Sequence, residues 1–298
     1  HGLHDAVVWN AHGPARDAFS TYPYVPPQVE SAGVPPQLAD LVLVIPWNDP
    51  AAIRQALREH GDELAAVICE PVNYNSGCIC PAPGLLELLR AETAQRGIVL
   101  IFDEVLSSFR MAAGGAQEYY KVTPDLCTLA KAVANGLPLA VVAGKREFMR
   151  VLSPLGPAAH SGTYSGHLFA ILAARAALQE IEQPGFYDRI FGNAERLYGG
   201  LSTLFTTHGV PARVQGLGAR FGIYFGVTHP VTAYQDAARM DGELGYRFIR
   251  ECFERGVYFH NYGKLAIGHH GFSAAHTPAD IAETLNRVED AVKAMQKG

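Results

Sequence analysis

The sequence predicts an α/β fold built around a mostly parallel sheet. Short apolar runs at residues 65–69, 99–102 and 139–143 have the length of buried strands. A helical stretch at residues 83–96, which ends before Gly97, separates the first two runs. Strands that alternate with helices of ten or more residues are typical of parallel βαβ units. We therefore expect a large α/β domain in this part of the chain.

The first sixty residues contain one predicted strand and one predicted helix. Residues 13–37 hold six prolines and show little periodicity, which indicates a long loop. Residues 41–45 form a short apolar run that predicts a buried strand. Asp49 and Pro50 then suit the N-cap and the first position of a helix, which we expect to run to about His60.

A domain boundary is expected near residue 180. Residues 167–180 predict a helix whose apolar side carries Leu168, Ile171, Leu172, Leu178 and Ile181. Pro184 and Gly185 end this pattern. The sequence thus predicts a large domain over residues 1–180 and a smaller α/β domain over residues 181–298.

The smaller domain is predicted to mix helices with short strands. A helix follows the break, and the glycine-rich stretch at residues 216–226 indicates short strands. Another helix is expected near residues 236–255. The last helix is the best specified, because Thr277 suits the N-cap, Pro278 the first position and Asp280 the third.

Composition narrows the classes of protein to which the chain can belong. The 298 residues are 48% hydrophobic, which describes a well-buried globular protein. A net charge of −5 gives no basic footprint for nucleic acid or an anionic membrane, and no apolar run reaches the roughly 18 residues of a membrane span. Five cysteines without a CxxC pair suggest neither a disulfide framework nor a zinc site. A reducing, cytoplasmic setting and no bound metal are expected.

Asp103 and Lys131 carry the strongest chemical signal in the sequence. Asp103 ends the apolar run at 99–102, and the carboxyl ends of strands are where open α/β sheets bind ligands. Lys131 lies among small and apolar neighbours at 129–133, and burial disfavours the charged form of a lysine. A neutral amine beside a carboxylate suits an enzyme that forms a Schiff base with its cofactor. A strand-capping Asp and a surface Lys are the structural alternative.

Four ordered motifs resemble those of the class III aminotransferases, which have the fold type I architecture and use pyridoxal 5′-phosphate (PLP). They are Ile68-Cys69-Glu70-Pro71-Val72, Phe102-Asp103-Glu104-Val105, Thr123-Pro124-Asp125-Leu126 with the following Lys131, and Ser161-Gly162-Thr163-Tyr164-Ser165-Gly166. The glycine-rich Gly114-Gly115-Ala116-Gln117 and the late Ser273-Ala274-Ala275-His276-Thr277 are most similar to the glutamate-1-semialdehyde aminomutase branch. The resemblance covers nearly the whole chain and is densest from about 65 to 175.

The resemblance implies roles for three residues around the cofactor ring. Lys131 would form the Schiff base with PLP and then shuttle a proton between substrate and cofactor. Asp103 would pair with the pyridine nitrogen and keep it protonated, so that the ring accepts electrons. Val105 would pack under the ring, although an ordinary core valine is the alternative.

Four further residues are implied at the edge of the site. Gly162 and Thr163 match the segment that contacts the cofactor phosphate from the neighbouring subunit, which implies a homodimer with a shared active site. Glu70 would lie on the substrate side or simply cap its strand. His1 would line the site, because a His-Gly pair of this kind lies well inside the family's large domain.

Two departures from the family pattern limit what can be expected. No segment matches the family's glycine-serine/threonine phosphate loop, its stacking aromatic or its carboxylate-binding arginine, so we expect a chain that lacks the family's N-terminal portion. Residues 257–279 contain no Asp or Glu, whereas true aminomutases carry a glutamate there. These facts favour a transaminase acting on an amino donor and a keto acid or aldehyde acceptor. An aminomutase, a racemase or a catalytically incomplete fragment remain the alternatives, and the substrate is open.

Overall fold

The computed structural model describes residues 1–9, 27–29, 31–261, 263 and 268–296. Contacts group the chain into two compact units, one of residues 57–72 and 83–188 and one of residues 1–56, 73–82 and 189–298. This grouping divides the chain differently from the expected 1–180 and 181–298, so that division stays a prediction. Most of the predicted loop at 13–37 lies outside the described residues.

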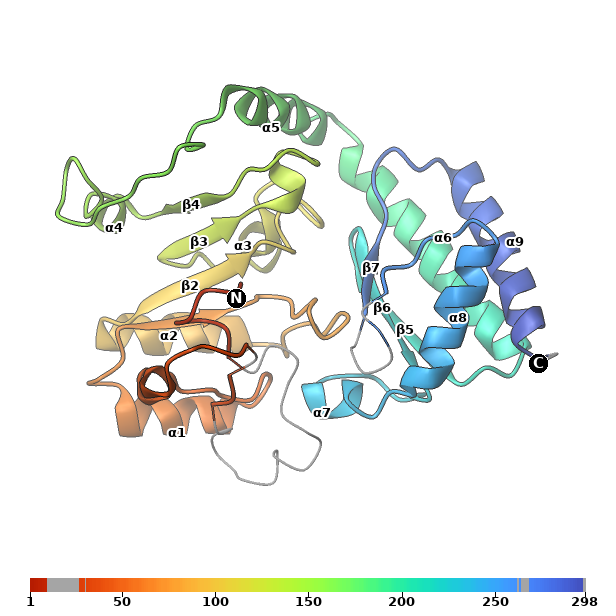
Figure 1. Ribbon diagram of the computed structural model, residues 1–298, viewed down its shortest axis with the longest axis horizontal. Coiled ribbons are helices and arrows are strands. Elements are labelled where there is room, and N and C mark those ends of the chain that lie inside the picture. Colours follow the sequence, from red (N-terminus) through yellow and green to blue (C-terminus); the bar gives the residue numbers. More distant parts are fainter. Residues whose placement is uncertain (10–26, 30, 262, 264–267, 297–298) are drawn as a thin grey trace. The chain divides into compact units, whose positions relative to one another are not determined.

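The unit of residues 57–72 and 83–188 is built on a mixed sheet of four strands in the order β1-β2-β3-β4. The strands are β1 (Ala66–Cys69), β2 (Val99–Glu104), β3 (Leu126–Leu129) and β4 (Val141–Gly144). The first three are parallel, and β4 pairs antiparallel with β3. The predicted α/β fold with a mostly parallel sheet is confirmed (Figure 1).

Four helices and one short 3-10 helix of the same unit accompany these strands. α2 (Leu85–Arg96) packs against β2, and Gly97 ends it in a left-handed conformation, φ 69°. α5 (Leu168–Ile181) packs against the 3-10 helix η3 (Lys131–Val133) (Figure 1). The remaining helices of this unit are α3 (Gly115–Tyr120) and α4 (Arg146–Met149). α1 (Pro50–His60) is divided between the two units, and Asp49 caps its first turn by accepting from the Ala52 N–H at 2.9 Å.

The second unit holds an antiparallel sheet in the order β5-β6-β7. Its strands are β5 (Ala212–Leu217), β6 (Arg220–Phe225) and β7 (His269–Gly271), and its helices are α7 (Tyr234–Ala237), α8 (Gly242–Glu254) and α9 (Pro278–Met295), with α6 (Phe186–Thr207) leading into it. Rings of Phe205, Phe225 and Phe248 meet at 5.0–5.6 Å between centroids and join α6, β6 and α8 in one core. The predicted cap of the last helix is confirmed, since Thr277 and Asp280 form a reciprocal capping box.

Two local predictions need correction. Within the described residues, 41–45 belong to no sheet ladder: Leu41 ends the 3-10 helix η2 (Pro36–Leu41), Val44 makes an isolated bridge, and residues 42–45 are only half-buried. The helix expected near 236–255 is two helices, because the chain leaves helical geometry between α7 and α8 and Asp241 caps α8 afresh.

The predicted apolar side of α5 is only partly covered. Ile181 is buried, as are Ala170 and Ala174, whereas Leu168, Ile171 and Leu172 are exposed.

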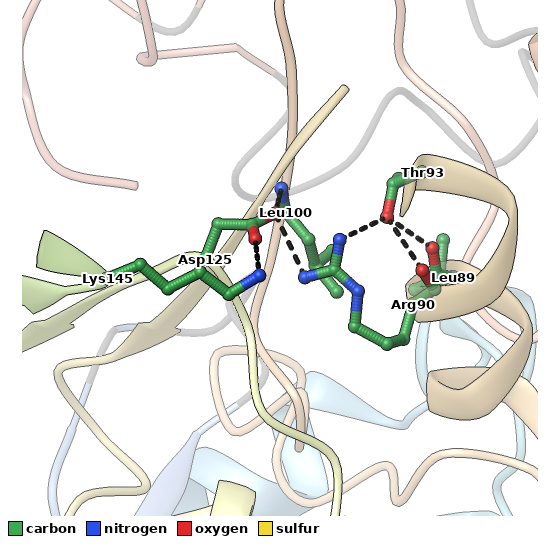
Figure 2. A network of polar contacts seen from close by, with 6 residues as sticks. All are labelled: Leu89, Arg90, Thr93, Leu100, Asp125 and Lys145. Atoms are coloured by element: carbon green, nitrogen blue, oxygen red, sulfur yellow. Dashed lines mark hydrogen bonds and ion pairs between the residues drawn. The ribbon is translucent and has the colours of Figure 1, made fainter. Parts of the chain in front are cut away.

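A buried carboxylate joins the amino ends of β2 and β3 to the carboxyl end of the antiparallel β4. Asp125, just before β3, accepts from the Leu100 N–H of β2 at 2.8 Å. It also forms ion pairs with Arg90 of α2 at 2.9 Å and with Lys145, just after β4, at 2.6 Å (Figure 2). Burial alone would raise the pKa of Asp125, but Lys145, the Leu100 N–H and Arg90 outweigh it and hold the pKa below its usual range.

Removing this carboxylate should destabilise the protein. Asp125→Ala is expected to lower the free energy of unfolding by about 3 kcal/mol, because the partly buried Arg90 loses its counter-charge and the Leu100 N–H loses its acceptor. Urea unfolding measures the change. The control Asp62→Ala removes an exposed carboxylate of the same unit and should stay within about 0.5 kcal/mol of the parent. Equal losses in both variants would contradict the role of Asp125.

A buried histidine makes the second unit sensitive to acid. His270 of β7 is 5% exposed, and its ring lies 5.0 Å from Phe259 and 5.4 Å from Phe221 between centroids. Burial, together with nearby His260 and Arg220, lowers the pKa of His270 to about 3. The imidazole is therefore neutral in the folded protein at pH values where it is charged in the unfolded chain.

Stability should fall as the pH drops below about 6.5, where the unfolded chain binds a proton at His270 that the folded protein does not. The free energy of unfolding should fall by up to about 1.4 kcal/mol per pH unit until the pH approaches the pKa of His270 in the folded protein. Urea unfolding at about pH 7.5 and about pH 5 measures it in the parent and in His270→Phe, where this part of the slope should vanish. The control His160→Phe, at an exposed position, should keep the parental slope. An unchanged slope in His270→Phe would refute the assignment.

Candidate functional site

Asp103 and Lys131 follow neighbouring parallel strands to the same edge of the sheet. Asp103 is the second-last residue of β2, and Lys131 comes two residues after the end of β3. The ladder pairs Glu104 with Leu129, so the two strands end side by side. Carboxyl ends of adjacent parallel strands form the ligand-binding edge of an open α/β sheet. The register therefore brings the ends of the two strands that precede these residues to one edge of the sheet, and their roles stay predictions.

The carboxylate of Asp103 is held by two donors on its own face of the sheet. The Val105 N–H donates to Oδ1 at 3.1 Å, and the Thr128 hydroxyl donates to the same oxygen at 3.3 Å. Asp103 and Thr128 are paired residues of the β2–β3 ladder, so their side chains lie on one face. Asp103 is half-buried, which leaves it accessible from the edge.

Lys131 begins η3 in a strained backbone conformation. Its φ is 50°, a left-handed value that residues other than glycine seldom adopt. The preceding Ala130 is extended, and the Lys131 carbonyl accepts from the Asn135 N–H at 3.1 Å, so the chain turns sharply at Lys131 as it leaves β3. Such strain persists where the surroundings over-determine the backbone, and it is concentrated at functional sites.

The expectation that Lys131 is buried is wrong. Its neighbours in sequence are apolar, and Val133 and Ala134 are indeed buried against Ala174 of α5. The turn at Lys131 directs that residue away from this cluster, and it is exposed. Burial therefore gives no reason for a neutral amine in this structure, and Lys131 is singled out by its position and its backbone instead.

Glu104 has a defined structural role that the sequence analysis missed. It is fully buried on the face opposite Asp103 and accepts from the Ala116 N–H at 2.6 Å, the Gln117 side chain at 3.0 Å and the Ser107 hydroxyl at 3.0 Å. Burial raises its pKa, although these hydrogen bonds oppose the rise. The sequence could have predicted this difference, because the side chains of two adjacent acids in a strand point to opposite faces of the sheet.

The other predicted residues divide into three groups. Glu70 directly follows β1, which is parallel to β2, so it lies at the same edge as Asp103, and the half-buried Val105 follows β2. Gly162 and Thr163 are exposed and lie at the start of a turn before α5. His1 belongs to the other compact unit, so its predicted role in lining the site stays a prediction.

A cavity of about 490 Å³ lies on the Glu104 side of the sheet. Its walls are Ser108, Phe109, Ala113, Gly114, Gly115, Gln117, Glu118, Thr123, Cys127, Leu129 and Ala143. None of the predicted site residues is among them. Across the described ranges, no three His, Cys, Asp or Glu side chains are grouped as a metal site would need.

Comparison with known proteins assigns the chain to a family. Residues 32–292 match the class-III aminotransferase family. Because this match covers most of the sequence, the chain belongs to that family, as the motifs predicted.

Solved structures support the same fold. The ω-transaminase from Sphaerobacter thermophilus is 28% identical, with a TM-score of 0.86 over 99% of this chain and 66% of that one. A transaminase with PLP bound is 27% identical, with a TM-score of 0.83 over 99% of this chain and 65% of that one. A glutamate-1-semialdehyde aminomutase from Pseudomonas aeruginosa PAO1 is 22% identical, with a TM-score of 0.77 over 98% and 64%, and shares the fold. The chain thus spans about two thirds of the length of these proteins, and its likeness extends beyond the aminomutase branch.

The strain at Lys131 predicts an unusual order of stability. The free energy of unfolding of Lys131→Gly should exceed that of Lys131→Ala by about 0.5–1 kcal/mol, because glycine adopts a positive φ without a steric cost. Urea unfolding compares the two variants. The same pair at Lys293, inside α9, should show the reverse order, since alanine is the better helix former. A Lys131→Ala variant as stable as Lys131→Gly would show that the residue is not strained.

Proposed function

We propose that this chain serves PLP-dependent amino transfer from an amino acid or amine to a keto acid or aldehyde acceptor. The carrying observation is the placement of Asp103 and Lys131 after adjacent parallel strands, at one edge of the sheet. Membership of the class-III aminotransferase family supports the proposal, as does the similarity to an ω-transaminase and to a transaminase with PLP bound.

The residues at this edge fit the proposed cofactor. A carboxylate, Asp103, is available to accept from a protonated ring nitrogen, and Lys131 supplies the primary amine that a cofactor aldehyde requires. Val105 adds a half-buried apolar side chain next to the carboxylate. PLP, when bound, withdraws electrons from the substrate carbon that carries the amino group.

Each residue has a distinct task in this proposal. Lys131 would hold the cofactor through Nζ, and the released Nζ would accept and return the substrate proton. Asp103 would pair with the ring nitrogen, while Val105 would pack against the ring. Glu70 would serve the substrate side of the same edge, and His1 is kept as a proposed lining residue.

We further propose a homodimer in which Gly162 and Thr163 contact the cofactor phosphate of the neighbouring subunit. Both residues are exposed and so available to a partner. The helix that follows them, α5, exposes a set of large apolar side chains, namely Leu168, Phe169, Ile171, Leu172 and Leu178. Exposed apolar patches of this kind mark interaction surfaces.

The functional division of the chain follows from these assignments. Residues 1–180 would form the cofactor-binding domain and residues 181–298 the smaller domain. We propose a cytoplasmic location, because all five cysteines are free in the structure. No helix in the described part of the chain is long and apolar enough to cross a membrane.

Reductive labelling tests the cofactor site directly. The purified chain, incubated with PLP and reduced with borohydride, should carry a pyridoxyl group on Lys131, as located by peptide mass spectrometry. Lys131→Ala should lose this label. Lys121→Ala is the matched control, because Lys121 is also exposed and also has a positive φ, 58°, and it should label as the parent does. Folded protein without a label at Lys131, or with equal label at Lys121, would contradict the proposed site.

Activity assays with and without an amino acceptor distinguish transamination from the other candidate reactions. Protein incubated with PLP but not reduced should transfer an amino group only when donor and acceptor are both present, and Lys131→Ala should lose this activity by at least about a thousandfold. Conversion of a single amino substrate without an acceptor would instead indicate an aminomutase or racemase. Retained transamination in Lys131→Ala would refute the role of the lysine.

A further inference from the structure

The hydroxyl of Thr128 is placed to control the orientation of Asp103. It donates to Oδ1 of Asp103 at 3.3 Å, while the Val105 N–H donates to the same oxygen at 3.1 Å. The two donors approach from different directions, one from the residue that follows β2 and one across the ladder from β3. Together they restrict rotation of the carboxylate, which a single donor would leave free to turn.

We propose that Thr128 is a positioning residue that fixes the Asp103 carboxylate toward the cofactor ring nitrogen. This inference rests on the proposed function of Asp103. The hydrogen bond from the Thr128 hydroxyl orients the carboxylate group. Thr128 itself does not touch the reacting atoms.

The fold places this hydroxyl with little freedom. Thr128 and Asp103 are direct partners in the parallel β2–β3 register, so their side chains share a face. A β-branched side chain has few rotamers, which limits where the hydroxyl can point. The neighbours Cys127 and Leu129 point to the opposite face, where both line the cavity beside Glu104.

Thr128 also lies close to Lys131 in the sequence. It is three residues before Lys131, so the same short stretch of chain carries the hydroxyl, in β3, and the amine, at the start of η3. A shift of β3 against β2 would therefore displace both residues relative to Asp103. The hydrogen bond from Thr128 to Asp103 forms only when the two residues are paired in the observed β2–β3 register.

Three substitutions separate positioning from packing. Thr128→Val keeps the shape and removes the hydroxyl, Thr128→Ser keeps the hydroxyl, and Thr123→Val makes the same change at an exposed threonine just before β3. Thr128→Val should bind PLP about tenfold more weakly and show an about tenfold lower kcat, the size expected for one hydrogen bond to a charged group. Thr128→Ser should recover to within about threefold, and Thr123→Val should match the parent.

A spectroscopic measurement identifies the cause. In Thr128→Val, the pH dependence of the absorption spectrum of bound PLP should shift relative to the parent, whereas Thr123→Val should leave it unchanged. Urea unfolding midpoints of the folded variants should stay close to the parental value. Equal losses in Thr128→Val and Thr128→Ser, with lower midpoints in both, would overturn the proposal in favour of a packing role.

Asp103→Asn distinguishes failure of this inference from failure of the proposed function. If the parent labels at Lys131 and Asp103→Asn weakens PLP binding, but Thr128→Val behaves as the parent, the positioning role is refuted alone. If the parent does not label at Lys131 and Asp103→Asn has no effect on PLP binding, both proposals fall together.

Discussion

The candidate site depends on the register between β2 and β3, and this register is held from the far end of the strands. There, Asp125 accepts from the Leu100 N–H and pairs with Arg90 and Lys145, so one carboxylate joins β2, β3, α2 and the end of β4 (Figure 2). A shift by one residue would turn every β3 side chain to the other face of the sheet. It would also separate Asp125 from these partners, so the buried charge opposes any such shift.

The alternation of side chains along β2 gives its two adjacent acids different environments. Asp103 stays half-buried at the ligand-binding edge, with two donors on one oxygen. Glu104 is fully buried on the opposite face, where it holds the backbone at Ala116 and leaves no room for a side chain at Gly115, whose φ is 71°. One acid thus lies at the ligand-binding edge, while the other fixes the loop behind it.

Prediction from sequence succeeded where local patterns determine the structure. Asp49 and Thr277 cap their helices as predicted, because capping depends on residues only three apart. Strand β3 was not predicted, since its four residues become a strand only through pairing with β2 and β4. The exposed part of the apolar side of α5 and the exposure of Lys131 were missed for a related reason. Composition shows that a side chain is apolar, but only tertiary packing decides which apolar face is covered.

The same distinction separates the well-placed site residues from the rest. Asp103 and Thr128 are positioned by a hydrogen-bonded ladder, and Lys131 follows the end of β3 by two residues. Sites built on such rigid elements hold their geometry better than sites on loops. Gly162 and Thr163 lie on an exposed turn outside this ladder, so the ladder cannot place them against the Asp103 edge. The proposed contact of these two residues with a cofactor phosphate would therefore need a second surface to hold the turn in place, and the exposed apolar face of the adjoining α5 is suited to bind such a surface. Under the proposed function, folding would set the ring-binding half of the site, and association with another subunit would set the phosphate-binding half.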